Sequence, residues 1–282
     1  MKQDCHMHMV LDGVYWKEAI ARHSHGVDLA YVRHILQQYQ RQGYTYLRDG
    51  GDRWGVGAAA RSVAGEYGIV YRTPLAPLCA RGHYGGFIGL TYDNLKEYAR
   101  LVKQQRQQGA DFIKIMISGL MDFDRFGVLT EEGLSREWIK ELVHIAHEEG
   151  FSVMAHANGA RTMENAAVAG VDSVEHGAYA DEDALQAMAE NGTVWVPTLS
   201  TIANLRGKGR FQEETVCRIL DSAVENVRRF AQIGGLVAPG SDAGAWAVAH
   251  GVDTETTLLE DALGTRATDI LLRGTQRIME KF

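Results

Sequence analysis

Cysteine and proline are scarce in this chain, and long hydrophobic runs are absent. The 282 residues contain three cysteines and four prolines. Cys5, Cys79 and Cys217 are odd in number and far apart, so they indicate free thiols in a reducing compartment and a cytoplasmic protein, not a disulfide framework. No run reaches the roughly 18 apolar residues of a membrane-spanning helix. The N-terminal residues also lack the basic segment and apolar core of a signal peptide.

An excess of positive charge is missing as well. The formal net charge is −7 at pH 7 and no basic stripe is visible, which argues against nucleic acid as the main partner. Apolar residues make up 45% of the chain, an ordinary value for a soluble protein. The length suffices for one α/β barrel, which needs about 250 residues. We therefore expect no nucleic-acid and no membrane partner, and we leave a homo-oligomer open.

Short apolar runs alternate with amphipathic stretches along the whole chain. Glycine stands just before most of the apolar runs, where it favours the left-handed end of a preceding helix. Strands are expected at 4–8, 44–48, 69–72, 111–117, 151–155, 171–175, 193–197 and 236–241. Helices are expected at 28–42, 93–108, 135–149, 162–169, 181–191 and 213–233, with one or two more at the C-terminal end.

This alternation predicts a parallel sheet with right-handed crossovers. A closed (β/α)8 barrel that forms a single domain over 1–282 is the favoured architecture, and a doubly wound open sheet is the alternative. In the run 111–117, Ile113, Ile115 and Ile117 share one face, while Phe112 and Lys114 share the other. That second face would line the barrel interior, where a lysine is costly unless it is paired or chemically changed.

Imidazole and carboxylate side chains stand at the ends of several apolar runs. His6 and His8 are two residues apart on an expected strand, so their rings share a face. Divalent metals such as zinc favour these ligand types. Taken singly, each residue has a structural alternative, such as a buried core histidine, a paired lysine or a helix N-cap. Taken together, the ordered set predicts a metal site made of His6, His8, Lys114, His156, His176 and Asp242.

Several segments resemble the amidohydrolase superfamily, and within it the branch of imidazolonepropionase and prolidase-like enzymes. They are residues 4–8, 46–51, 109–119, 156–159, 169–177 and 240–244. The resemblance implies an α/β (β/α)8 TIM barrel with its site at the C-terminal ends of the strands. Members of this branch usually carry an accessory β-sandwich built from both chain ends. Only three residues precede the first expected strand here, so the sandwich is expected to be lacking.

The resemblance also implies a role for each candidate ligand. His6 and His8 would bind one metal ion, and His156 and His176 a second. Lys114 would react with carbon dioxide and bridge the two ions as a carbamate. Asp242 would bind the first ion and carry the catalytic proton. The implied cofactors are two divalent ions, with zinc expected, and the implied partner is a small-molecule substrate.

The implied activity is metal-dependent hydrolysis of an amide-type C–N bond in a dipeptide, an N-acyl amino acid or a cyclic amide. Two alternatives stay open: a deaminase with one metal ion, and a barrel that binds metal or ligand without turnover. Lys114 argues against the first, and Asp242 against the second.

Loop residues that overhang the expected mouth are candidates for substrate binding. They are Arg81, His83 and Tyr179. Glu175 precedes His176, so strand alternation predicts that it points away from the lumen and supports the site indirectly. Arg48 is expected in a structural ion pair beside Asp49, and Cys5 in buried packing.

Overall fold

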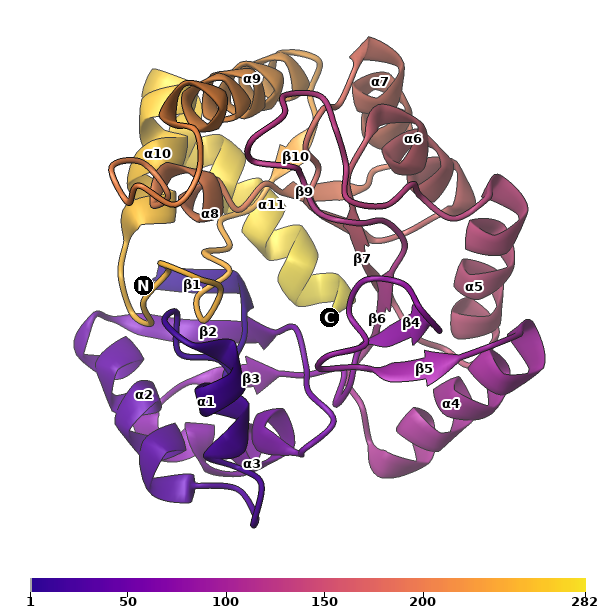
Figure 1. Ribbon diagram of the computed structural model, residues 1–282, viewed down its shortest axis with the longest axis vertical. Coiled ribbons are helices and arrows are strands. Elements are labelled where there is room, and N and C mark those ends of the chain that lie inside the picture. The colour runs from indigo at the N-terminus through magenta and orange to yellow at the C-terminus, as the bar shows by residue number, and fades with distance from the viewer. Residues whose placement is uncertain (1) are drawn as a thin grey trace.

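Parallel strands form a ring surrounded by helices in the computed structural model, which describes residues 2–282 (Figure 1). One sheet has the order β1-β2-β3 and the other the order β10-β9-β8-β7-β6-β4-β5, and every pair is parallel. The first sheet consists of β1 (Lys2–Met7), β2 (Tyr44–Asp49) and β3 (Val70–Arg72). The second consists of β4 (Leu78–Ala80), β5 (Leu90–Tyr92), β6 (Ile113–Met116), β7 (Val153–Ala157), β8 (Ser173–His176), β9 (Val194–Val196) and β10 (Leu236–Val237).

Backbone hydrogen bonds join the two sheets on both sides. On one side the Cys5 amide donates to the Pro239 carbonyl over 2.8 Å. On the other, the Asp111 amide donates to the Thr73 carbonyl over 3.0 Å. The strands therefore follow one another around a ring, and the α/β barrel fold expected from the sequence is confirmed. All strands among residues 2–282 belong to these two sheets, so none of them builds a separate β-sandwich.

The third strand position around the ring differs from the prediction. Only one strand, at 69–72, was expected there. Instead, β3 pairs with β2, and β4 continues the same position by pairing with β6. Strand β5 is added on the outer side of β4. The short interruption between β3 and β4 contains Pro74 and Pro77, which cannot donate to a sheet ladder.

Helices surround the ring, as expected from the amphipathic stretches. Asp28, Asn94, Ser135 and Asp181 cap α2, α4, α5 and α7 through their side-chain oxygens. The helices are α1 (Trp16–Ala21), α2 (Leu29–Arg41), α3 (Val56–Ala64), α4 (Leu95–Gln108), α5 (Arg136–Glu148), α6 (Ala160–Ala169), α7 (Glu182–Glu190), α8 (Ser200–Ala203), α9 (Glu213–Gln232), α10 (Thr254–Leu263) and α11 (Ala267–Lys281), with 3-10 turns at Gly65–Tyr67 and Gly264–Arg266. The sequence did not indicate α1, α3 or α8.

The core has an outer and an inner layer. Ile113, Ile115 and Ile117 are buried in the outer layer, among the apolar faces of the helices. Phe112 lies in the inner layer, so the predicted alternation of this strand is confirmed. Helix α11 crosses behind the centre of the ring (Figure 1) and adds Ile278 and Phe282 to the inner layer.

Two expectations, on the cysteines and on membrane-spanning helices, can be compared with the structure. The three cysteines are free thiols, and Cys5 is buried in the inner layer, as expected. Within residues 2–282, no helix combines the length and the apolar character needed to cross a bilayer.

Candidate metal centre

The six candidate ligands converge inside one end of the ring. The Nε2 atoms of His6 and His8 lie 3.3 Å apart, and Lys114 Nζ lies 3.4 Å from His6 Nε2. Asp242 Oδ1 lies 3.6 Å from His6 Nε2 and 3.3 Å from His8 Nε2. The His176 ring centroid lies 5.1 Å from that of His6 and 4.6 Å from that of His156. Each candidate thus neighbours at least one other, although they are spread over nearly the whole chain.

His6 is oriented by Glu175, whose Oε2 atom lies 2.7 Å from His6 Nδ1. Both side chains are fully buried. The carboxylate accepts a hydrogen bond from Nδ1–H, which leaves the lone pair of Nε2 facing the cluster. Glu175 therefore supports the site indirectly, as expected, but the predicted orientation away from the lumen was wrong. His176 has φ 67°, so strand alternation ends there and both Glu175 and His176 reach the interior.

Arg48 pairs with Glu175 and not with the neighbouring Asp49. Its Nη2 atom lies 2.9 Å from Glu175 Oε1, and its Nη1 atom donates to Ser173 Oγ over 3.0 Å. Its Nε atom donates to the Cys5 carbonyl over 2.6 Å. The expected structural ion pair is present, and it links the backbone of β1 to the carboxylate that orients His6.

Three residues around the site adopt a left-handed backbone although none is glycine. Their φ angles are 67° for His176, 50° for Thr198 and 53° for Asp242. Such a conformation is uncommon, above all for a β-branched residue, and is held only where surrounding contacts stabilise it. One such contact is the 2.8 Å hydrogen bond between His176 Nδ1 and Thr198 Oγ1. The backbone bends sharply where these side chains must enter the interior.

Two glycines leave the space that the side chains of His6 and His8 need. A Cβ on Gly50 would lie 2.2 Å from His8 Cε1. A Cβ on Gly240 would lie 2.8 Å from His6 Cβ and 2.4 Å from Val196 Cγ1. These distances are far below van der Waals contact, so any side chain at either position would displace a candidate ligand.

Burial sets the charge state of the cluster. It lowers the pKa of His8 and of His156 to about 3, and it holds the pKa of His6 and His176 well below the usual range. These imidazoles are neutral near pH 7, as metal ligands must be. Burial also lowers the pKa of Lys114 and raises the pKa of Asp242.

The donor set of this cluster fits a divalent cation. His6 Nε2, His8 Nε2 and an Asp242 oxygen lie within 4.8 Å of one another, in the range needed to share one ion. Neutral imidazole nitrogens and a carboxylate are ligand types of zinc and its neighbours in the first transition series.

Comparisons with known proteins identify the family of the chain. Residues 33–275 match the model of the amidohydrolase family. The chain belongs to the amidohydrolase family. Divalent metals are used generally in this family, in keeping with the donor set found here. His6 and His8 lie outside the matched range, so their place in the site rests on the geometry above.

The relatives of this amidohydrolase include ochratoxinase of Aspergillus niger. The two sequences are 27% identical over 279 residues, covering 85% of this chain and 56% of the relative. The chain thus spans about half the length of the curated relatives it matches. The crystal structure of A. niger ochratoxinase superposes with a TM-score of 0.76 at 25% identity, over 96% of this chain and 69% of that one.

A crystal structure of a Xaa-Pro dipeptidase with methionine bound in its active site is also similar. Its TM-score is 0.78 at 22% identity, and the match covers 99% of this chain and 74% of that one. This likeness supports the fold of the amidohydrolase barrel.

The rim of the candidate site is built from loops and is more exposed. The Arg81 side chain is 62% exposed and pairs with Asp93 over 2.5 Å. His83 Nδ1 lies 3.4 Å from Glu131 Oε2. The Tyr179 ring contacts that of Phe126 at 5.4 Å between centroids. Within residues 2–282, no hydrogen bond or ion pair joins any of these three residues to the six candidate ligands. Their role in substrate binding stays a prediction.

Sequence reasoning missed Tyr84. Its ring centroid lies 4.9 Å from that of His156, and its backbone amide donates to Glu131 Oε2 over 2.9 Å. The only signal in the sequence is its place beside His83, in a loop expected to overhang the mouth.

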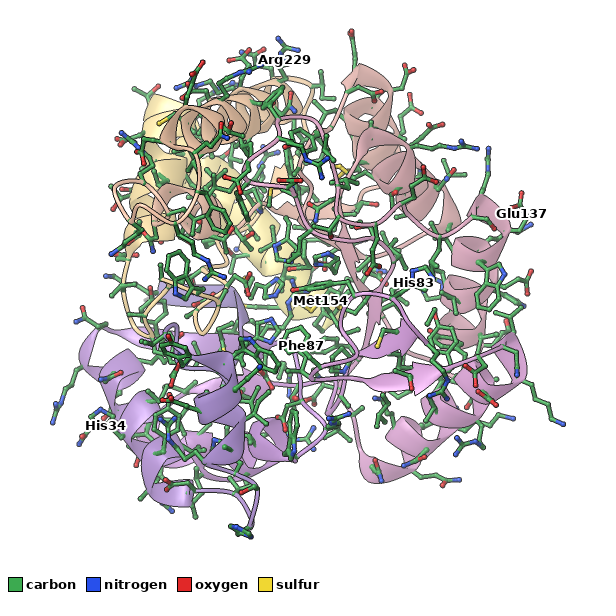
Figure 2. All side chains as sticks on the ribbon, in the orientation of Figure 1. His34, His83, Phe87, Glu137, Met154 and Arg229 are labelled. Carbon is green, nitrogen blue, oxygen red and sulfur yellow. The ribbon has the colours of Figure 1, made fainter. Side chains whose placement is uncertain are left out.

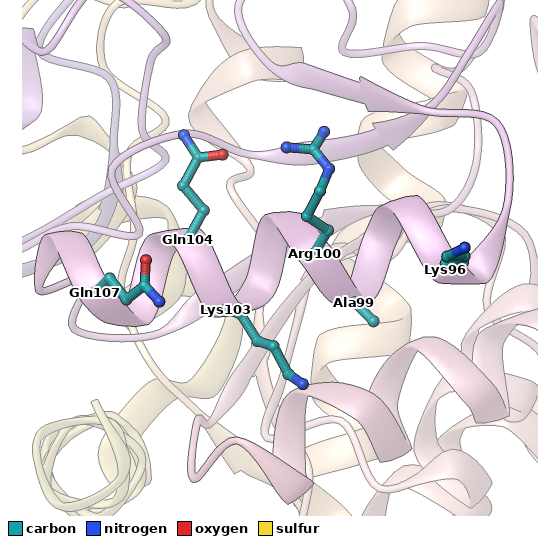
Figure 3. Close-up of a pocket in the computed structure, with 6 residues that line it drawn as sticks. All are labelled: Lys96, Ala99, Arg100, Lys103, Gln104 and Gln107. Atoms are coloured by element: carbon teal, nitrogen blue, oxygen red, sulfur yellow. The ribbon is translucent and has the colours of Figure 1, made fainter.

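A hollow lies on the outer wall of the barrel, along helix α4 (Figure 3). Its lining residues all come from that helix: Lys96, Ala99, Arg100, Lys103, Gln104 and Gln107. It offers no carboxylate, imidazole or thiol, and it is separate from the strand ends that carry the metal-site cluster.

Proposed function

We propose that this chain hydrolyses an amide-type C–N bond with the help of two divalent metal ions, with zinc expected. The observation that carries the proposal is the convergence of four neutral imidazoles and one carboxylate around the buried amine of Lys114. His6, His8 and Asp242 would hold one ion, and His156 and His176 the other. When bound, such a pair polarises a carbonyl oxygen and eases the ionisation of water near neutral pH.

Lys114 would join the two halves of this centre as a carbamate. Its neutral amine adds to the carbon of carbon dioxide, a nitrogen–carbon bond forms, and one proton leaves. A buried neutral amine is thereby replaced by an anion with two oxygens. Burial favours the neutral amine that this reaction needs, because the pKa of Lys114 is lowered.

Asp242 would move the proton. Its Oδ1 atom faces the Nε2 atoms of His6 and His8. We therefore assign the proton to Oδ2, which lies 3.9 Å from His176 Nδ1. Oδ2 accepts a proton from the attacking water and delivers it to the departing nitrogen, which is a poor leaving group unless protonated.

The substrate class is an N-acyl amino acid, a dipeptide or a cyclic amide. The relatives support this choice only by name, since one is called ochratoxinase and another a Xaa-Pro dipeptidase. The free thiols are consistent with action in a reducing compartment such as the cytoplasm.

The test is a screen of N-acyl amino acids and dipeptides with zinc-loaded wild-type protein and the Asp242→Asn variant. Asparagine keeps the shape of the side chain but cannot carry the proton. We expect turnover to fall about 10²–10⁴-fold while fold and metal content are retained. Asp269→Asn is the matched control, because Asp269 is exposed on α11 and should leave turnover unchanged. Wild-type turnover by folded, metal-loaded Asp242→Asn protein would contradict the mechanism.

A further inference from the structure

Three aromatic rings form a continuous row from the metal-site cluster to the surface. Tyr84 lies on His156 at 4.9 Å between ring centroids. Phe87 follows at 5.9 Å from Tyr84, and Trp16 at 5.4 Å from Phe87. We call Tyr84, Phe87 and Trp16 the aromatic row. Figure 2 places the labelled Phe87 near the middle of the ring of strands in projection, close to the label of the inner-layer residue Met154.

Hydrogen bonds and close packing hold the loop that carries Tyr84 and Phe87. The Tyr84 amide donates to Glu131 Oε2, and the Ile88 carbonyl accepts from the Arg53 amide over 2.9 Å. Gly85 sits against Met116, where a Cβ would lie 2.7 Å from Met116 Cγ. The loop therefore has little freedom, and a ligand that meets the row does not have to order it first.

The outer end of the row leaves apolar surface in water. Trp16 is 47% exposed, and its neighbours Val14 and Tyr15 are exposed further. Contiguous exposed apolar side chains are typical of a surface that contacts a ligand or a partner. Among residues 2–282, the cation stacked on the row is Lys17, whose Nζ atom lies 5.4 Å from the Trp16 ring at the solvent end.

We propose that the aromatic row is a substrate subsite for a flat, uncharged ring attached next to the scissile amide. This inference rests on the proposed function and specifies its substrate class. The row begins at a ring in contact with His156, so a group bound beside the reacting carbonyl meets it directly. Aromatic side chains pack favourably on a flat apolar group in offset or edge-to-face arrangements.

Two matched substrate pairs test this subsite. N-benzoylglycine against N-acetylglycine places the ring on the acyl side, and N-acetyl-L-phenylalanine against N-acetyl-L-alanine places it on the amine side. We expect at least one pair to show about a tenfold higher kcat/KM for the ring-bearing member. Trp16→Ala and Phe87→Ala should each reduce that preference severalfold through KM.

Two further variants guard the interpretation. Phe87→Leu keeps apolar volume without a ring, so it should fold normally and still lose preference. Tyr15→Ala removes an exposed ring outside the row and should retain the preference. No preference in either pair, or an equal preference in wild type, Trp16→Ala and Phe87→Leu, would overturn the subsite.

Binding separates this proposal from the hydrolase itself. The same four compounds are titrated calorimetrically into zinc-loaded Asp242→Asn protein, with and without Trp16→Ala. Tighter binding of a ring-bearing compound, weakened by Trp16→Ala, supports the subsite even if no amide is cleaved. Cleavage without ring-dependent binding leaves the hydrolase standing and removes the subsite.

Discussion

The candidate ligands in the interior, which we call the floor of the site, and the loop residues around its mouth, which we call the rim, differ in burial and in the elements that carry them. The floor consists of the six candidate ligands and Glu175. Its members are buried, as shown by His6 at 0% and Lys114 at 1% exposure, except for His176, which is partly buried. All of them are carried by strands or by the turns that follow them. The rim consists of Arg81, His83 and Tyr179, which lie on loops. The difference teaches that the packed core of this barrel holds the candidate ligands in place, while the loops around the mouth can vary and determine which substrate binds.

The largest loss of activity is expected from a substitution of Lys114 in the floor. Lys114→Ala removes the amine that would carry the carbamate, and we expect a loss of activity of about 10³-fold or more. Steady-state kinetics on zinc-loaded protein measures the loss. A small carboxylate such as acetate should restore part of the activity by entering the space left behind.

Lys114→Met is the matched control for packing. Methionine fills most of the volume and cannot form a carbamate, so this variant should be inactive and insensitive to acetate. Native mass spectrometry near neutral pH should show wild-type protein heavier by one carbon dioxide. Full activity in either variant would remove Lys114 from the mechanism.

A smaller effect is expected one layer behind the floor, at Glu175. Glu175→Gln retains the shape but weakens the hold on His6 Nδ1, so we expect zinc affinity to fall about 10–100-fold. Competition with a chromogenic chelator measures the affinity. Glu137→Gln, on the exposed face of α5, should bind zinc like the wild type. Equal zinc affinity in Glu175→Gln would show that His6 needs no oriented partner.

Further from the floor, His250 links folding to pH. Its Nε2 atom lies 2.8 Å from the Leu11 carbonyl, and burial lowers its pKa to about 4. The folded state therefore keeps His250 neutral where the unfolded state is protonated. The stability this provides is fully present above about pH 6.5 and is lost as the pH falls towards 4, by at most about 3 kcal/mol.

His250→Gln should consequently lose less stability than wild type between pH 6.5 and 4. Urea unfolding of metal-free protein at both pH values measures the difference. His144→Gln, which changes an exposed histidine on α5, should follow the wild type. An identical pH dependence in His250→Gln would show that this ring does not titrate on unfolding.

The smallest effect is expected at the rim. Arg81 is exposed and pairs with Asp93 across the same loop region, and a surface ion pair contributes about 0–1 kcal/mol. Arg81→Ala should change kcat/KM less than about threefold and leave zinc affinity unchanged. A much larger rise in KM with kcat retained would instead make Arg81 a substrate-binding residue.

The sequence predicted the floor better than the rim for a physical reason. Residues at the C-terminal ends of neighbouring parallel strands lie at the same end of the barrel. His6, Lys114 and His156 could therefore be placed together from the pattern of strands in the sequence. The orientation of Glu175 could not, because the left-handed turn at His176 leaves no mark in a strand pattern.

The positions of the loop residues could not be predicted, because they depend on contacts between segments that are far apart in the sequence. Tyr84 reaches His156 because Glu131, from another loop, holds its backbone amide. The strands β4 and β5 were missed because they lie in a stretch rich in proline and glycine, including Pro77 and Gly89, which is typical of a loop. Arg48 was correctly expected in an ion pair, but its partner Glu175 comes from β8 and could not be read from neighbours in the sequence.

The central claim is that the floor holds two metal ions. A crystal structure of the protein grown with zinc, with anomalous differences collected at the zinc edge, tests it most directly. The account predicts one peak beside His6, His8 and Asp242, a second beside His156 and His176, and carbamate density on Lys114 between them. A single peak with a free Lys114 amine would favour a one-metal enzyme, and no peak among these side chains would contradict the account.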